Sequence, residues 1–183
     1  MIFTAAELDD MAILLGVQKL ELFVKSEWGA QALNHSSLIK LDLGERTYKK
    51  FETTDASISH AEGLGGYALI HYAEGEDLRL GFDIEIAARV RPEVAARICE
   101  HDNEFKAAPS PAALWSAKEA GFKCFKGPDQ PPVIPYLVVH SWKRKSQYET
   151  FEISHRQTET GLKAWGLTFQ KDVYQFAIAR RSP

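Results

Sequence analysis

The sequence contains little of what secreted, membrane-spanning or fibrous proteins need. Two cysteines in 183 residues cannot build a disulfide framework, and so low a content suits a reducing compartment. The longest apolar stretches, such as Met11–Val17, fall far short of the roughly 20 residues of a transmembrane helix. The first ten residues lack a basic segment and carry acidic side chains early, unlike a secretion signal. We therefore expect a cytoplasmic protein without a membrane partner.

The sequence also has no large excess of positive or negative charge. The formal net charge is −3, which gives no general attraction to nucleic acid. Short basic clusters at Arg46–Lys50, Lys123–Lys126 and Lys143–Lys145 are typical of a solvated surface, yet they leave room for a compact anionic ligand. The content of 45% hydrophobic and 26% charged residues is that of an ordinary globular domain, which at this length buries roughly 70% of its unfolded surface.

The N-terminal third is expected to be mainly helical. Thr4 and Glu7 form a capping-box pattern, which predicts a helix that ends at Gly16. A second helix is predicted over Gln18–Leu33, followed by a break at 34–37. Two later segments, Leu38–Leu43 and Tyr48–Phe51, are predicted as short strands or irregular connections.

The remainder alternates between groups of strands and groups of helices. Strands are predicted at Ala56–Ser59, Tyr67–Tyr72 and Leu78–Glu85, the last two as a hairpin. Helices are predicted from Pro92 to about Glu100 and from Ser110 or Pro111 to about Phe125. Four more strands follow, at Val133–Trp142, Tyr148–Ile153, Leu162–Gln170 and Val173–Ala179, with Pro135 favouring an edge strand or a late start. This order predicts an α+β fold: one domain, 1–183, of two similar lobes, about 1–80 and 81–183, each with a helix on an antiparallel sheet.

A pair of acidic residues lies at the end of one predicted strand. In the segment Gly81–Glu85, strand alternation places Asp83 and Glu85 on one face and the intervening apolar residues on the other. Two adjacent carboxylates repel each other unless they are solvated or share a cation. Mg²⁺ prefers one or two carboxylates together with phosphates. A solvated polar strand face is the alternative interpretation.

Two further segments carry candidate functional groups. Trp115, Glu119 and Lys123 recur at i, i+4 and i+8 and so lie on one face of a helix. A simple Glu119–Lys123 ion pair, with Trp115 in the core, would explain this pattern equally. His60 lies in Ser57–Gly63, which ends in a glycine turn, where a histidine can donate to a phosphate or play a structural part.

The order and spacing of these segments resemble those of the 4′-phosphopantetheinyl transferase superfamily. That family has a Ser-His segment, a Gly-x-Asp-x-Glu strand end and a Trp-Ser-x-Lys-Glu-Ala-x-x-Lys helix. The resemblance covers about Ala56 to Gly127. It implies the larger, pseudo-dimeric single-chain type, acting as a monomer.

The resemblance also implies a role for each matching residue. It implies that Asp83, Glu85 and Glu119 bind Mg²⁺ and that Glu119 is the base for an incoming serine hydroxyl. Lys123 corresponds to the lysine that contacts the phosphates of coenzyme A and protonates the leaving group. Further contacts to phosphate are implied for His60 and for Lys49 or Lys50, although the family usually has Gly-Lys-Pro where this chain has Tyr48–Phe51. For Lys118 the resemblance implies a contact to phosphate or to the surroundings of the metal ion.

The activity implied is transfer of 4′-phosphopantetheine from coenzyme A to a serine of an apo acyl, polyketide or peptidyl carrier protein. Adenosine 3′,5′-bisphosphate would be released. One alternative is a catalytically degenerate module that binds coenzyme A or a carrier protein. Another is an unrelated α+β protein.

One residue of the predicted Trp115–Lys123 helix is a poor helix former. Gly121 lies inside this segment, where glycine costs up to about 1 kcal/mol of helix stability relative to alanine.

Overall fold

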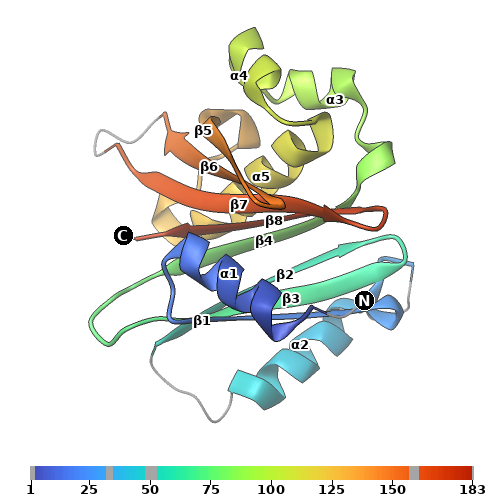
Figure 1. Ribbon diagram of the computed structural model, residues 1–183, viewed down its shortest axis with the longest axis vertical. Coiled ribbons are helices and arrows are strands. Elements are labelled where there is room, and N and C mark those ends of the chain that lie inside the picture. The colour runs from blue at the N-terminus through green and yellow to red at the C-terminus, as the bar shows by residue number, and fades with distance from the viewer. Residues whose placement is uncertain (1–2, 32–34, 48–52, 157–160, 183) are drawn as a thin grey trace.

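Two antiparallel sheets form the frame of the molecule in the computed structural model (Figure 1). The structure describes residues 3–31, 35–47, 53–156 and 161–182. Sheet A has the strand order β1-β3-β2 and is built from β1 (Lys19–Lys25), β2 (Thr54–Ala61) and β3 (Leu64–His71). Sheet B has the order β4-β8-β7-β6-β5 and is built from β4 (Arg79–Ile86), β5 (Leu137–Lys145), β6 (Tyr148–His155), β7 (Lys163–Lys171) and β8 (Tyr174–Arg181).

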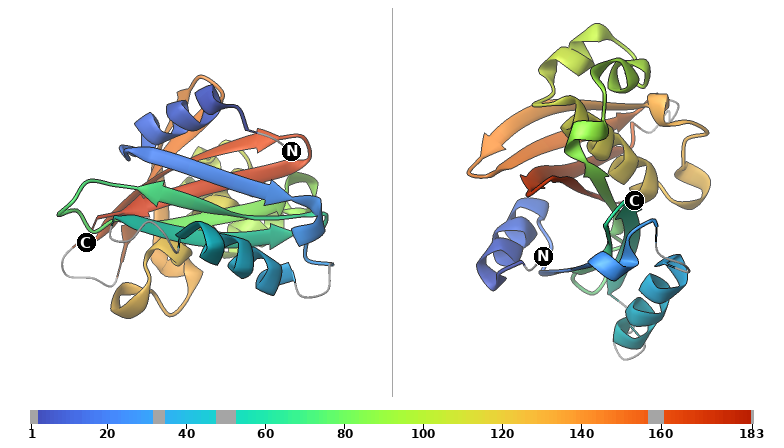
Figure 2. Two further views of the ribbon diagram at one scale, coloured as in Figure 1. Left: turned by 90° about the horizontal axis from the view of Figure 1, so that it is seen from below. Right: turned by 90° about the vertical axis from the view of Figure 1, so that its right-hand side faces the viewer.

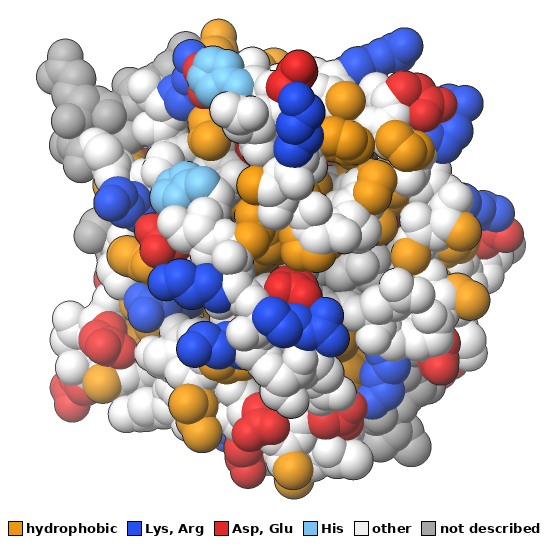
Figure 3. Space-filling view, turned by 45° about the horizontal axis from the view of Figure 1, so that its top comes forward, with side chains coloured by type: hydrophobic (Ala, Val, Ile, Leu, Met, Phe, Trp, Pro, Cys, Tyr) orange, Lys and Arg blue, Asp and Glu red, His pale blue; other side chains and the backbone are white. Residues whose placement is uncertain are grey.

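Helices cover these sheets, so the predicted α+β class is confirmed. They are α1 (Ala5–Leu15), α2 (His35–Thr47), α3 (Pro92–Arg97), α4 (Asp102–Ala107) and α5 (Pro111–Cys124), joined by short 3₁₀ turns. In the side view, α2 lies on the outer face of sheet A, while α5 lies against sheet B (Figure 2). None of the described helices is long and apolar enough to cross a membrane. Basic and acidic side chains are interspersed on the face shown in Figure 3, in keeping with the small net charge.

The predicted first and last helices are confirmed in detail. Thr4 caps α1 with both bonds of the capping box, and Gly16 ends it in the left-handed conformation, with φ of 64°. Ser110 caps α5 through its hydroxyl, which accepts from the Ala113 amide, and a proline occupies the first turn. These local signals need no tertiary partner, which is why the sequence alone was enough to locate them.

The segment from residue 18 to residue 47 was predicted wrongly. The described part of this predicted helix, residues 18–31, is not an α-helix: it contains β1, where Leu20, Leu22 and Val24 alternate into the core. Residues 35–43, predicted as part of a break followed by a short strand or an irregular connection, lie in α2 instead, with Ile39 fully buried. Strand alternation in β1 outweighed the sparse helical spacing of its larger residues. The predicted element at Tyr48–Phe51 lies outside the described residues.

The predicted hairpin of Tyr67–Tyr72 with Leu78–Ile84 is also wrong. β3 pairs with β1 and β2, whereas β4 pairs with β8, more than 80 residues away in the chain. The four C-terminal strands are confirmed and form an antiparallel meander from β5 to β8. As the proline at 135 indicated, β5 begins only at Leu137 and lies at the sheet edge.

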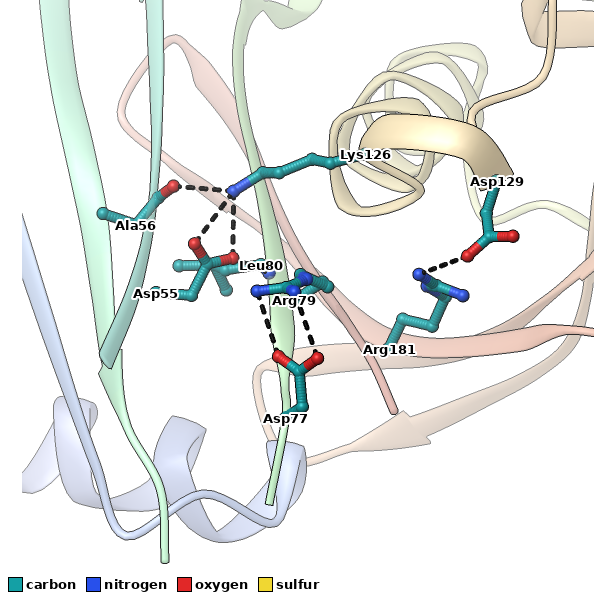
Figure 4. A network of polar contacts seen from close by, with 8 residues as sticks. All are labelled: Asp55, Ala56, Asp77, Arg79, Leu80, Lys126, Asp129 and Arg181. Atoms are coloured by element: carbon teal, nitrogen blue, oxygen red, sulfur yellow. Dashed lines mark hydrogen bonds and ion pairs between the residues drawn. The ribbon is translucent and has the colours of Figure 1, made fainter. Parts of the chain in front are cut away.

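The two sheets meet where β2 runs beside β4, a junction that we call the seam. No backbone ladder is recorded there between the described strands. Instead, amides of β4 donate to side chains of β2: Leu80 to Asp55 at 2.6 Å, Phe82 to Ser57 at 2.9 Å and Ile84 to Ser59 at 3.2 Å. At one end of the seam, the Lys126 amine also bonds both carboxylate oxygens of Asp55 (Figure 4).

Glycines allow α5 to lie unusually close to sheet B. A Cβ atom at Gly81 of β4 would lie 1.7 Å from the carbonyl oxygen of Ala120. A Cβ atom at Gly121 would lie 2.5 Å from Ile153 Cδ1. The helical cost of Gly121 is therefore offset by close packing, and α5 is pressed against the strand that carries Asp83 and Glu85.

We predict that Gly81→Ala destabilises the protein by about 1–3 kcal/mol or more, because the added methyl group must push α5 away from β4. Gly44→Ala is the matched control, since a Cβ at Gly44 in α2 meets no atom within 4 Å. That control is expected to stabilise by up to about 1 kcal/mol through helix propensity. Chemical denaturation of both variants measures the two effects. Wild-type stability of the Gly81→Ala protein would contradict the close approach of α5.

Candidate active site

Three sequence segments that are distant in the chain converge at the seam. Asp83 comes from β4, Lys123 from α5 and Ser59 from β2. The Lys123 amine lies 2.8 Å from Asp83 Oδ1 and donates to the Ser59 hydroxyl at 3.1 Å. Ser59 in turn donates to the same Asp83 oxygen at 3.1 Å. The structure thus brings the predicted strand, helix and Ser-His segments together.

The second oxygen of Asp83 distinguishes this cluster from an ordinary ion pair. Asp83 is 3% exposed, and its Oδ2 atom is buried with no hydrogen-bond partner in the described part of the chain. Leaving a buried acceptor unsatisfied costs about 1–3 kcal/mol, and more for a charged group. An unpartnered carboxylate oxygen is a suitable ligand for a small cation.

Glu85 lies two residues along the same strand and on the same face, as strand alternation predicts. The Trp115 indole of α5 donates to Glu85 Oε1 at 3.1 Å. Burial, and next the charge of Asp83, raise the pKa of Glu85 to about 7, although the Trp115 hydrogen bond opposes the shift. The pKa is raised because burial removes water from the Glu85 carboxylate, and because the negative charges of Asp83 and Glu119 lie nearby.

Glu119 completes the acidic group from the helix side. Burial, followed by the charge of Asp83, raises its pKa, while Lys123 lowers it. The amine of Lys123 donates to the Phe82 carbonyl of β4 at 2.9 Å as well as to Asp83 and Ser59. Lys123 therefore links α5 to the seam, which is more than an ion pair within one helix would do.

His60 lies at the end of β2 and has a neighbour that the sequence did not predict. Its ring centroid lies 4.2 Å from that of His35, in an edge-to-face arrangement. Desolvation, and then the charge of His35 and of Lys123, lower the pKa of His60. His35 was missed because the segment around it was predicted as a break. The signal that would have found it is the helical spacing of the residues that follow it in α2.

One predicted residue is not brought to the cluster. Lys118 points to the opposite side of α5, where its fully buried amine pairs with Glu104 at 2.8 Å and donates to the Leu137 carbonyl at 2.6 Å. In this structure Lys118 is therefore an interior residue that points away from the cluster. The candidates Lys49 and Lys50 lie outside the described residues.

The acidic cluster is not a ready-made metal site. No three His, Cys, Asp or Glu side chains of the described residues are already arranged to hold a metal ion. The Lys123 amine gives a physical reason, because it takes the Asp83 oxygen that faces the helix. The chemistry of the donor set nevertheless fits Mg²⁺, since it combines hard oxygen ligands, an unsatisfied buried oxygen and raised carboxyl pKa values.

Together these groups are suited to holding an anion through a cation. Three carboxylates would repel a phosphate on their own, whereas a divalent ion among them reverses the sign of the local charge. The Lys123 amine lies at the same place, so both acidic and basic groups are available there for proton transfer.

Comparison with known proteins adds no family assignment: no protein-family model matches the chain, and no curated protein matches its sequence.

Proposed function

We propose that the protein is a Mg²⁺-dependent 4′-phosphopantetheinyl transferase. It transfers the phosphopantetheine group of coenzyme A to a serine hydroxyl of an apo carrier protein and releases adenosine 3′,5′-bisphosphate. The observation that carries this proposal is the buried, unpartnered Asp83 Oδ2, which lies in a cluster with Glu85 and Glu119, while the other Asp83 oxygen pairs with Lys123 of α5. A merely structural ion pair has no need of the extra carboxylates.

The bonds that change assign a task to each side chain. The serine oxygen forms a bond to the phosphorus that carries pantetheine, and the bond from that phosphorus to the oxygen of the departing bisphosphate breaks. Glu119 accepts the serine proton, for which its raised pKa is suited. Lys123 neutralises or protonates the leaving oxygen, and His60 holds a phosphate of the bound substrate.

Asp83, Glu85 and Glu119 would hold the magnesium ion, which supplies charge neutralisation at the diphosphate. Three features belong to the same proposal: a duplicated origin of the two lobes, a monomeric state and a cytoplasmic location. The arrangement of α2 on sheet A and of α5 on sheet B supports the duplication.

The direct test is to incubate the protein with coenzyme A, Mg²⁺ and several apo carrier proteins and to measure the carrier mass. We expect one phosphopantetheine addition on the acceptor serine. Asp83→Asn should abolish most of the transfer, while Asp77→Asn should leave it intact because Asp77 is exposed and pairs with Arg79 away from the cluster. Binding of coenzyme A or carrier without a mass change would identify a non-catalytic module instead.

Glu119→Gln separates a base from a helix-surface residue. The change preserves size and helix propensity but removes a charge and a proton acceptor. We expect at least the roughly 10²-fold loss of rate that is typical of a general base, with little recovery at saturating Mg²⁺. Glu93→Gln in α3 is the control, because Glu93 is exposed and pairs with the exposed Arg91. A near-wild-type rate for Glu119→Gln would rule out the proposed base.

The raised pKa of Glu85 predicts how stability depends on pH. The folded protein holds the Glu85 proton up to about pH 7, whereas the ordinary value is 4.5. The folded state therefore binds more protons than the unfolded state between these values, and stability falls as the pH rises through this window. Glu85→Gln should gain stability relative to wild type as the pH rises from 5 to 8.

Mg²⁺ is expected to reverse this loss in the wild-type protein, because a cation favours the ionised carboxylate. Melting temperatures at pH 5 and pH 8, with and without Mg²⁺, measure both effects. If Mg²⁺ shifts the Glu85→Gln protein as much as the wild type at pH 8, Glu85 takes no part in cation binding.

A further inference from the structure

A second ionic group lies inside the protein, on the side of α5 away from the seam. The Lys118 and Glu104 side chains are 0% and 3% exposed, and their charged atoms lie 2.8 Å apart. Glu104 also accepts hydrogen bonds from the amides of Val139 and Glu100, at 2.8 Å and 3.1 Å. With the bond from Lys118 to the Leu137 carbonyl, this network joins α4, α5 and β5.

Stability alone is a poor reason for such a pair. Desolvation of two charges largely cancels their attraction, so that apolar residues of similar size are often equally stabilising. Removal of only one partner is costly because it leaves an unpaired buried charge. A buried pair that is kept in place of apolar residues therefore suggests a geometric purpose.

The purpose follows from the position of Lys118 in the chain. Lys118 directly precedes Glu119, and consecutive residues of an α-helix point about 100° apart around its axis. Lys118 is held by a hydrogen bond to the Leu137 carbonyl of β5 and by the ion pair with Glu104 of α4, so Glu119 is turned toward β4 and its two carboxylates. The close contacts at Gly81 and Gly121 fix the distance of α5 from the sheet, whereas the buried pair resists rotation of the helix about its own axis.

We propose that the Lys118–Glu104 pair is a positioning element that sets the rotation of α5 and thereby holds Glu119 and Lys123 over β4. Lys118 acts through Glu119 and touches no substrate. The catalytic consequence rests on the proposed transferase function, whereas the effect on cation binding by the carboxylate cluster does not.

The experiment compares Lys118→Met, Glu104→Gln and the double variant with the wild-type protein. The exposed Lys106→Met substitution in α4 is the matched control. The readouts are melting temperature, Mg²⁺ affinity by calorimetry, and kcat and KM for coenzyme A. The fluorescence of Trp115, whose indole bonds to Glu85, reports cation binding without turnover, and a Trp115→Phe background identifies its signal.

We expect Lys118→Met to lower Mg²⁺ affinity and kcat at least 10-fold, while KM for coenzyme A changes less than twofold. Glu104→Gln should behave in the same way. The double variant leaves no unpaired buried charge, so its melting temperature should recover toward wild type while Mg²⁺ affinity and kcat stay low. Lys106→Met should match wild type in every readout.

Two results would overturn the proposal. Recovery of Mg²⁺ affinity and kcat along with stability in the double variant would make the pair purely structural. A large rise in KM for coenzyme A in Lys118→Met, with Mg²⁺ affinity retained, would mean that Lys118 contacts a phosphate directly. If the wild type binds Mg²⁺ but transfers nothing, the transferase proposal fails, and Mg²⁺ affinity in the same variants still decides the positioning role. If the wild type binds no Mg²⁺, both proposals fail.

Discussion

The hydrogen bonds from β4 amides to β2 side chains are the constraint on which the rest of the site depends. Asp55, Ser57 and Ser59 take the place of the carbonyl groups that a neighbouring strand would offer. The buried edge of β4 is thereby satisfied without merging the two sheets into one. Because side chains are longer than backbone carbonyls, the seam leaves room for Lys123 to reach both strands. Asp83 is consequently buried and close to a cation at once.

The seam also explains how the fold accommodates a cluster of negative charges that repel each other. Glu85 and Glu119 are forced into partial burial beside Asp83, and their pKa values rise for that reason. One lysine is shared among them, which compensates part of the repulsion but leaves Asp83 Oδ2 without a partner in the described structure. A buried oxygen without a partner is expected where ligand binding, rather than folding, determines which residues are present. A magnesium ion bound there would give Asp83 Oδ2 a partner and would stabilise the fold together with the site.

Sequence reasoning was most successful where structure is determined locally. The caps of α1 and α5, the alternation of Asp83 and Glu85, and the shared helix face of Trp115 and Glu119 all follow from short-range geometry. It failed where the outcome depends on distant partners. β4 pairs with the distant β8 and not, as the predicted hairpin required, with the preceding strand. The segment predicted as a helix forms β1 because every second side chain is buried on one face of the strand. His35 was lost with the helix that carries it.

Lys118 shows why a motif does not determine the direction of its side chains by itself. Within Lys118-Glu119, helical geometry separates the two groups by about 100°, but it leaves open which of them faces the site. That choice is made by β5 and α4, which lie outside the motif and supply the Leu137 carbonyl and the Glu104 carboxylate. A buried lysine must have such partners, so its burial requires both neighbouring elements to be in place. The motif and its surroundings therefore specify the site jointly: the motif supplies the chemical groups, and the interior pair determines which of them reach the seam.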